Sequence, residues 1–164
     1  MKKIRSFIML FIFSILLSSC SGYNKIMRNH LSDPASYCEY IVEVQEIAIS
    51  QYDSNKLVFF VKLFSKEEYA KFSGVSAENI TLAPEDYLIT LEIRGDNFKE
   101  VCDNGLMEEI QPGDIIEVVA SIWIYMDGDF FYIIGLSTDN KEYLNKDEGL
   151  QNLIEYMNKN KSLL

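Results

Sequence analysis

Histidine is almost absent from this sequence, which contains only His30. That residue lies in the stretch from Ser21 to Asp33, which has no sustained hydrophobic period and is predicted to be a polar tether. We interpret His30 as a solvated linker residue rather than as a base or a ligand. Because Ser/His/Asp catalysis needs an ordered histidine, the sequence offers no catalytic constellation, and we predict that the protein is not an enzyme.

Cysteine is scarce as well: after residue 20 only Cys38 and Cys102 remain. Without a third cysteine or an ordered histidine, these two residues cannot complete a zinc site, so no metal and no cofactor are predicted. In an oxidising compartment Cys38 and Cys102 could pair in a disulfide. Two buried free thiols are the alternative, and the sequence leaves both open.

Basic residues are outnumbered, with 15 Lys and Arg against 25 Asp and Glu and a net charge of −10. Residues 1–19 hold three basic residues and no acidic ones, so the chain from residue 20 onward has a net charge of −13 and only two arginines, Arg28 and Arg94. Proteins hold nucleic acid through Lys and Arg on its phosphates. The acidic surplus therefore predicts that nucleic acid is not a partner.

A hydrophobic run long enough to span a membrane is missing too. Phe7 to Leu17 is apolar except for Ser14, which is shorter than the roughly 20 residues that a spanning helix needs. The run follows the basic residues Lys2, Lys3 and Arg5, and this order is typical of a signal peptide.

The segment Leu17-Ser18-Ser19-Cys20 closes the run and resembles the lipobox of bacterial lipoprotein precursors. The resemblance implies that residues 1–19 are a cleaved signal peptide and that Cys20 carries a thioether-linked diacylglycerol, with palmitate as a typical acyl chain. Acyl chains of this kind hold a protein on a bilayer without a spanning helix. We therefore expect a lipid-anchored protein on the extracytoplasmic face of a bacterial membrane, with residues 20–35 as its tether. An ordinary secretory signal and an uncleaved anchor are the alternatives.

Alternating and helical hydrophobic patterns divide the rest of the chain into short elements. Apolar residues shift from even to odd positions between Val44 and Ile47, which predicts a β-bulge in the first strand. Strands are predicted at Tyr37–Gln51, Lys56–Phe64, Tyr87–Arg94, Ile115–Tyr125 and Asp129–Leu136. Helices are predicted at 65–72, at 96–110, and in the tail, where Leu150, Leu153, Ile154 and Met157 recur at helical spacing.

This order of elements, with a Pro112-Gly113-Asp114 turn before the fourth strand and an Asp127-Gly128 turn after it, resembles the OB-fold. The resemblance implies a mainly β fold with α: a five-stranded Greek-key barrel over residues 36–137, with a helix between strands three and four. Residues 138–164 are expected to form a C-terminal amphipathic helix and a tail.

Candidate binding residues follow from the same resemblance, because OB-fold ligands lie across strands two and three and between two loops. Trp123 and Tyr125 are added because strict alternation places them opposite Ile122 and Ile124, although the C-terminal helix could cover them. Three aspartates in the two loops also raise calcium as an alternative, but hairpins favour Asp for dihedral reasons alone. The candidates are Tyr52, Asp53, Phe60, Lys62, Thr90, Glu92, Trp123, Tyr125, Asp127 and Asp129.

Taken together, these features predict a membrane-anchored binding module for an envelope protein, a peptide or a glycan. Two alternatives remain open at this point. One is a cell-envelope hydrolase that uses scattered carboxylates. The other is an inhibitor or immunity-type lipoprotein that blocks a basic protein, for which the acidic charge would favour association that weakens with salt.

Overall fold

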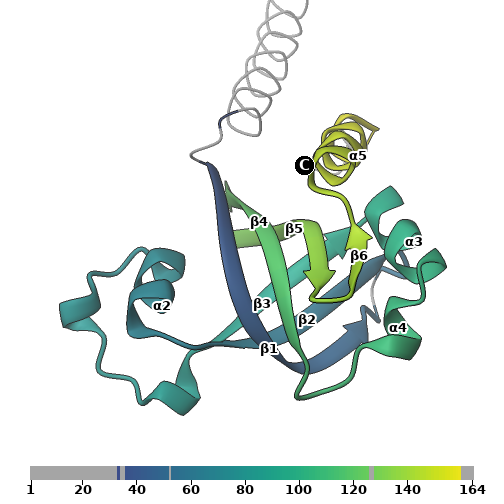
Figure 1. Cartoon of the computed structure of the whole chain (residues 1–164). Coiled ribbons are helices and arrows are strands. Elements are labelled where there is room, and N and C mark those ends of the chain that lie inside the picture. Colours follow the sequence, from purple (N-terminus) through teal and green to yellow (C-terminus); the bar gives the residue numbers. More distant parts are fainter. Residues whose placement is uncertain (1–32, 34–35, 52, 126–127, 160–164) are drawn as a thin grey trace, which may run out of the picture. The chain divides into compact units, whose positions relative to one another are not determined.

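Six strands form a curved sheet in the computed structural model, which describes residues 33, 36–51, 53–125 and 128–159 (Figure 1). The sheet order is β3-β2-β1-β4-β5-β6, with antiparallel neighbours throughout. A parallel pairing of Glu92 with Tyr132 joins β3 to β5 and partly closes the sheet into a barrel. The strands are β1 (Tyr37–Ile49), β2 (Lys56–Leu63), β3 (Leu88–Arg94), β4 (Ile115–Tyr125), β5 (Gly128–Thr138) and β6 (Lys141–Leu144).

The five predicted strands are therefore present, and the prediction of five strands in all is corrected by β6. This strand has only four residues and follows the Asp139-Asn140 turn, so its pattern is too short to separate from the start of the next helix. It forms because Tyr143 and Leu144 are buried, at 3% and 1% exposed. The sheet thus extends past residue 137, where the sequence placed the end of the barrel.

The predicted β-bulge in β1 is confirmed by a register shift between Val44 and Glu46 against β2. The bulge lies where β1 changes neighbours: Tyr37 to Glu43 pair with β4, and Val42 to Ile49 pair with β2. At the bulge, the Val44 amide donates to Asp114 O at 2.9 Å and the Gly113 amide donates to Val44 O at 2.8 Å. One strand therefore serves two walls of the barrel.

Two helical segments interrupt the strand order where the sequence predicts them. α2 (Lys66–Ser73) begins with a capping box between Ser65 and Glu68 and ends at Gly74, whose φ is 65°. Two short 3₁₀ helices, η2 (Ala77–Asn79) and η3 (Pro84–Asp86), follow it before β3. Between β3 and β4 lie α3 (Asp96–Asp103) and α4 (Leu106–Glu109), separated at Gly105.

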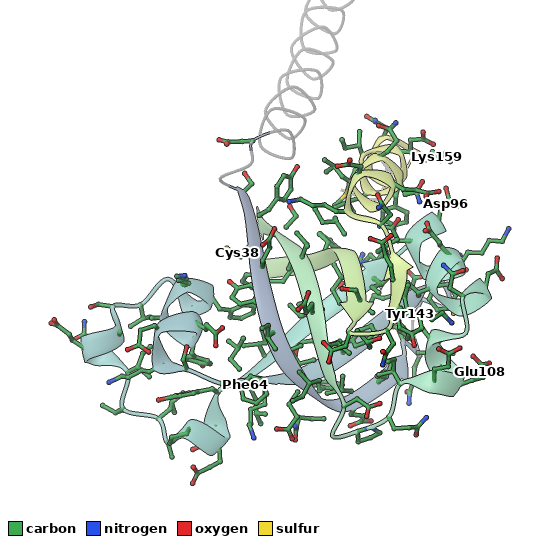
Figure 2. All side chains as sticks on the ribbon, in the orientation of Figure 1. Cys38, Phe64, Asp96, Glu108, Tyr143 and Lys159 are labelled. Carbon is green, nitrogen blue, oxygen red and sulfur yellow. The ribbon has the colours of Figure 1, made fainter. Side chains whose placement is uncertain are left out.

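The barrel core is closed at one end by α3 and α4, which bury Val101 and Leu106 completely. The C-terminal helix α5 (Lys146–Lys159) packs on β5 and buries Leu153 and Met157. It also contacts α3, since Asn97 Nδ2 donates to Gly149 O at 2.8 Å and Lys159 Nζ lies 3.6 Å from Asp96 Oδ2 (Figure 2).

The two remaining cysteines are free thiols in the described part of the chain, Cys38 on β1 and Cys102 on α3. The Cys38–Cys102 disulfide, left open by the sequence, is not formed in this structure. The predicted signal peptide, Cys20 and nearly all of the tether lie outside the described residues. Among the residues that are described, no helix is both long and apolar enough to cross a bilayer.

Candidate partner-binding face

Strand alternation gives the β1–β4 half of the barrel a buried inner face and an open outer face. On β2 the inner residues Leu57, Phe59, Val61 and Leu63 are 0% exposed, whereas the outer residue Phe60 is 42% exposed. The outer face is therefore a solvent-exposed surface made by four neighbouring strands.

Large apolar side chains gather on this outer face. Lys62 of β2 pairs with Glu43 on one side and Leu88 on the other, and Glu43 in turn pairs with Ile115 of β4. Phe60 and Ile41 lie two residues from Lys62 and Glu43, hence on the same side of their strands. We call the four apolar residues the apolar patch: Ile41, Phe60, Leu88 and Ile115, which are 49%, 42%, 53% and 57% exposed.

An ion pair lies in the middle of the apolar patch. Lys62 Nζ is 3.0 Å from Glu43 Oε2, and Gln45 Nε2 donates to Glu43 Oε1 at 3.0 Å. The hydrogen bond from Lys62 lowers the pKa of Glu43 most, and the hydrogen bond from Gln45 lowers it further. Lys62 is thus neutralised by its neighbour and does not make the face basic.

Three of the residues that the OB-fold resemblance assigned to a ligand face lie together here. Phe60 and Thr90 face each other across β2 and β3, and Lys62 follows on the same face. Asp53 instead shapes its turn, since its carboxylate accepts from the Asn55 amide at 3.0 Å. Tyr52 and Asp127, and the side chains of Trp123, Tyr125 and Asp129, lie outside the described residues.

Glu92, the fourth sheet residue of the predicted ligand face, has a different surrounding. It is 8% exposed, and its carboxylate lies 2.7 Å from both Lys56 Nζ and Arg94 Nη2. The Arg94 guanidinium lies 5.4 Å from the ring centroid of Tyr132, the residue that Glu92 pairs with on β5. Burial lowers the pKa of Arg94, but Tyr132 and Glu92 raise it more. Glu92 therefore links charges at the barrel closure.

Beside the apolar patch lies a groove of about 500 Å³, lined by residues of β1, β4, β5 and β6 together with Glu68 of α2 and Lys146 of α5. The groove shares Ile41 with the apolar patch, and Glu117, which pairs with Ile41 across β1 and β4, also lines it. Its charged lining consists of four carboxylates and one ammonium group: Glu39, Glu68, Glu117, Glu142 and Lys146. We call this hollow the acidic groove.

A polar cluster ties β6 to the helices that plug the barrel. Tyr143 Oη donates to Glu109 Oε2 at 2.7 Å, and Lys141 Nζ donates to Glu109 Oε1 at 2.7 Å (Figure 2 labels Tyr143). Burial, followed by the hydrogen bond to Glu109, raises the pKa of Tyr143 to about 12. The hydrogen bonds from Lys141 and Tyr143 lower the pKa of Glu109.

The raised pKa of Tyr143 predicts a loss of stability in alkali. An unfolded tyrosine releases its proton near pH 10, whereas the folded Tyr143 keeps it until about pH 12. The stabilisation is complete below pH 10 and is lost as the pH rises through this window. Between about pH 9 and about pH 11.5, denaturant titrations should show the wild type losing about 2 kcal/mol more unfolding free energy than Tyr143→Phe. Equal losses in the two proteins would contradict the assignment.

The segment between β2 and β3, residues 64–87, packs on the barrel through aromatic rings. Phe72 of α2 stacks on Phe131 of β5, with ring centroids 3.7 Å apart. Tyr69 stacks on Tyr87 at 5.4 Å. Three apolar side chains of this segment are exposed: Phe64, Val75 and Leu82, at 49%, 44% and 43% (Figure 2 labels Phe64). Phe64 comes directly after β2.

Comparison with known proteins places the chain by its fold only. No family model and no curated protein matches the sequence. Among solved structures, a chain of the S. pombe Stn1–Ten1 complex is similar, with 10% identity, a TM-score of 0.39, and coverage of 81% of this chain and 76% of the other. PriB from Ralstonia solanacearum has 12% identity, a TM-score of 0.32, and coverage of 63% and 97%. The architecture is OB-fold-like, with a sixth strand.

One prediction from the sequence is wrong and is corrected by these neighbours. The acidic net charge was taken to exclude nucleic acid as a partner, and the OB-fold-like neighbours contradict that exclusion. The OB-fold includes proteins whose sheet face binds oligonucleotides. Net charge is a sum over the whole chain and does not show which charges share a face.

Proposed function

We propose that the protein is a lipoprotein, held by acyl chains on Cys20 at the extracytoplasmic face of a bacterial membrane, whose outer sheet face binds another protein. The lipobox-like segment Leu17–Cys20 supports the anchor. The apolar patch carries the binding role, because four large apolar side chains on one sheet face are each 42% to 57% exposed. Such gatherings on soluble domains mark interaction surfaces.

A protein suits this face better than a glycan does. The large exposed side chains of the face are the four aliphatic or phenyl groups of the apolar patch, and its polar members include the Glu43–Lys62 ion pair, Glu46 and Thr90. Small-molecule sites are concave and place a few polar groups around the ligand, whereas the core of a protein interface is apolar with few charges.

The test is photo-cross-linking in bacterial cells that express the full chain with a benzophenone amino acid in place of Phe60. The wild-type chain is expected in the membrane fraction with a protein adduct, and Cys20→Ser is expected in the soluble fraction, since acyl chains supply the membrane affinity. Ile41→Asp with Leu88→Asp should keep the chain at the membrane and reduce the adduct by about ten-fold or more, the effect of about 1.4 kcal/mol.

Val75→Asp with Leu82→Asp is the matched control, because these exposed apolar residues lie outside the apolar patch. This pair should leave the adduct within about two-fold of the wild type, as surface substitutions usually have small effects. Membrane association of Cys20→Ser would disprove the anchor. A missing wild-type adduct, or equal losses in the two Asp pairs, would disprove binding through the patch.

A further inference from the structure

The acidic groove and the apolar patch form one continuous surface. They share Ile41, and Glu117 lines the groove directly across β1 and β4 from Ile41. In sheet order, β3, β2, β1 and β4 carry the patch, and β1, β4, β5 and β6 carry the groove. A single partner segment lying across β1 and β4 therefore meets both.

The unpaired charges on this surface are negative. Lys62 forms an ion pair with Glu43 at 3.0 Å, and Lys146 forms one with Glu39 at 3.5 Å. Glu46, opposite Phe60 on the patch, and Glu117 make no ion pair within the described part of the chain. The groove thus holds four carboxylates against one ammonium group, and the potential of such a hollow attracts cations.

Tyr40 belongs to the inner wall of the groove. It is 3% exposed and part of the barrel core, and strand alternation places its side chain opposite that of Ile41. The groups on the outer face that can bind a partner are therefore the exposed carboxylates and the apolar patch.

We propose, on the basis of the protein-binding function above, that the partner is a basic protein segment, with apolar side chains on the apolar patch and a lysine or arginine in the acidic groove. The groove volume of about 500 Å³ accommodates such a side chain. Arginine suits the groove best, because its planar guanidinium forms paired hydrogen bonds with carboxylates. An acidic partner would meet like charges at the rim and in the groove, and such juxtaposition disfavours association.

The experiment uses the same cross-linker at Phe60 in the full chain, now with Glu117→Lys and Glu142→Lys. We expect the adduct to fall about ten-fold or more, because two attractive charges become repulsive. Asp103→Lys with Glu108→Lys changes the net charge equally at two exposed residues of α3 and α4 that do not line the groove (Figure 2 labels Glu108). This control should keep the adduct within about three-fold, since long-range attraction alone is screened by salt.

The result that overturns the proposal is an equal loss in both pairs, which would mean that net charge rather than the groove attracts the partner. Mass spectrometry of the wild-type adduct gives a second readout: an acidic segment, a glycan or nucleic acid in place of a segment with Lys or Arg would also overturn it. If the variant with Glu117→Lys and Glu142→Lys does not fold, Glu117→Gln is tested in its place, because it removes one charge and keeps the shape of the side chain. Loss of the wild-type adduct itself would refute the proposed function instead.

Discussion

Gly149→Ala is expected to lower the free energy of unfolding by about 3 kcal/mol or more, the upper range for overpacking. Gly149 is a buried residue of α5. A Cβ there would overlap the Ile134 carbonyl oxygen of β5 and lie 2.8 Å from the carbonyl carbon. The carbonyl is backbone in the middle of a strand, so the helix must move. This expected loss of stability is opposite in sign to the usual effect in a helix interior, where replacing glycine by alanine stabilises the helix by about 1 kcal/mol.

Chemical denaturation of the full chain measures this effect, with Glu148→Ala as the neighbouring control. Glu148 is exposed on the same turn of α5, and its substitution should change stability by about 0.5 kcal/mol or less. The hydrogen bond from Asn97 to Gly149 O would be lost as α5 moves, which adds to the penalty. If Gly149→Ala were as stable as Glu148→Ala, the close contact between α5 and β5 would be wrong.

Glu92→Ala is the second substitution with a large expected effect, a loss of about 3 kcal/mol in unfolding free energy. It leaves Lys56 and Arg94 without their shared carboxylate at the closure between β3 and β5. All three side chains are largely buried, with 11% to 20% of each side chain exposed. Removing one member of a buried ion cluster leaves uncompensated charge, which is more destabilising than losing an exposed pair.

Glu46→Ala provides the comparison, because Glu46 lies on the same outer face, is exposed, and has no ion pair within the described residues. Its substitution should be nearly neutral when the unfolding free energies of both variants and the wild type are measured by urea titration. Glu92→Ala combined with Lys56→Met should be less than additive, since the charge that Glu92 neutralises is then absent. Additive losses would show that Glu92 does not stabilise the closure through Lys56.

The strands and their faces were predictable because their hydrophobic patterns are long and regular. Tyr87, Ile89, Leu91 and Ile93 alternate through the third strand, and all four are buried. The phase shift between Val44 and Ile47 located the bulge, and Ser65 with Glu68 located the start of α2. Each of these signals is local, so no knowledge of the remaining chain is needed to interpret it.

The apolar patch was only partly predictable. Phe60 was identified through the OB-fold resemblance, whereas Ile41, Leu88 and Ile115 were not. An apolar residue at a strand position gives no local sign of whether another layer covers it, because that depends on where distant elements pack. The ion pairs of Glu92 were not predicted for a related reason: its partner Lys56 is 36 residues away, and only the register between β2 and β3 brings the charges together.

The acidic groove needed β6, which the sequence did not separate from the tail. Glu142 enters the groove because residues 141–144 pair with β5, and Glu117 enters from β4 on the other side of β5. The acidic composition was plain in the sequence. The clustering of acidic side chains in the groove depends on the pairing of β6 with β5, and a four-residue strand is too short to be predicted from its sequence pattern.

β6 also protects the edge of the sheet from pairing with the sheet of another molecule. A barrel that ended at β5 would present a long row of open amide and carbonyl groups, a template for adding strands from neighbouring molecules. β6 covers part of that row with only four residues, and Asn104 Nδ2 donates to Tyr143 O at 2.9 Å on β6 itself. Short edge strands with occupied carbonyls resist edge-to-edge aggregation, which matters most for molecules held at high density on a surface.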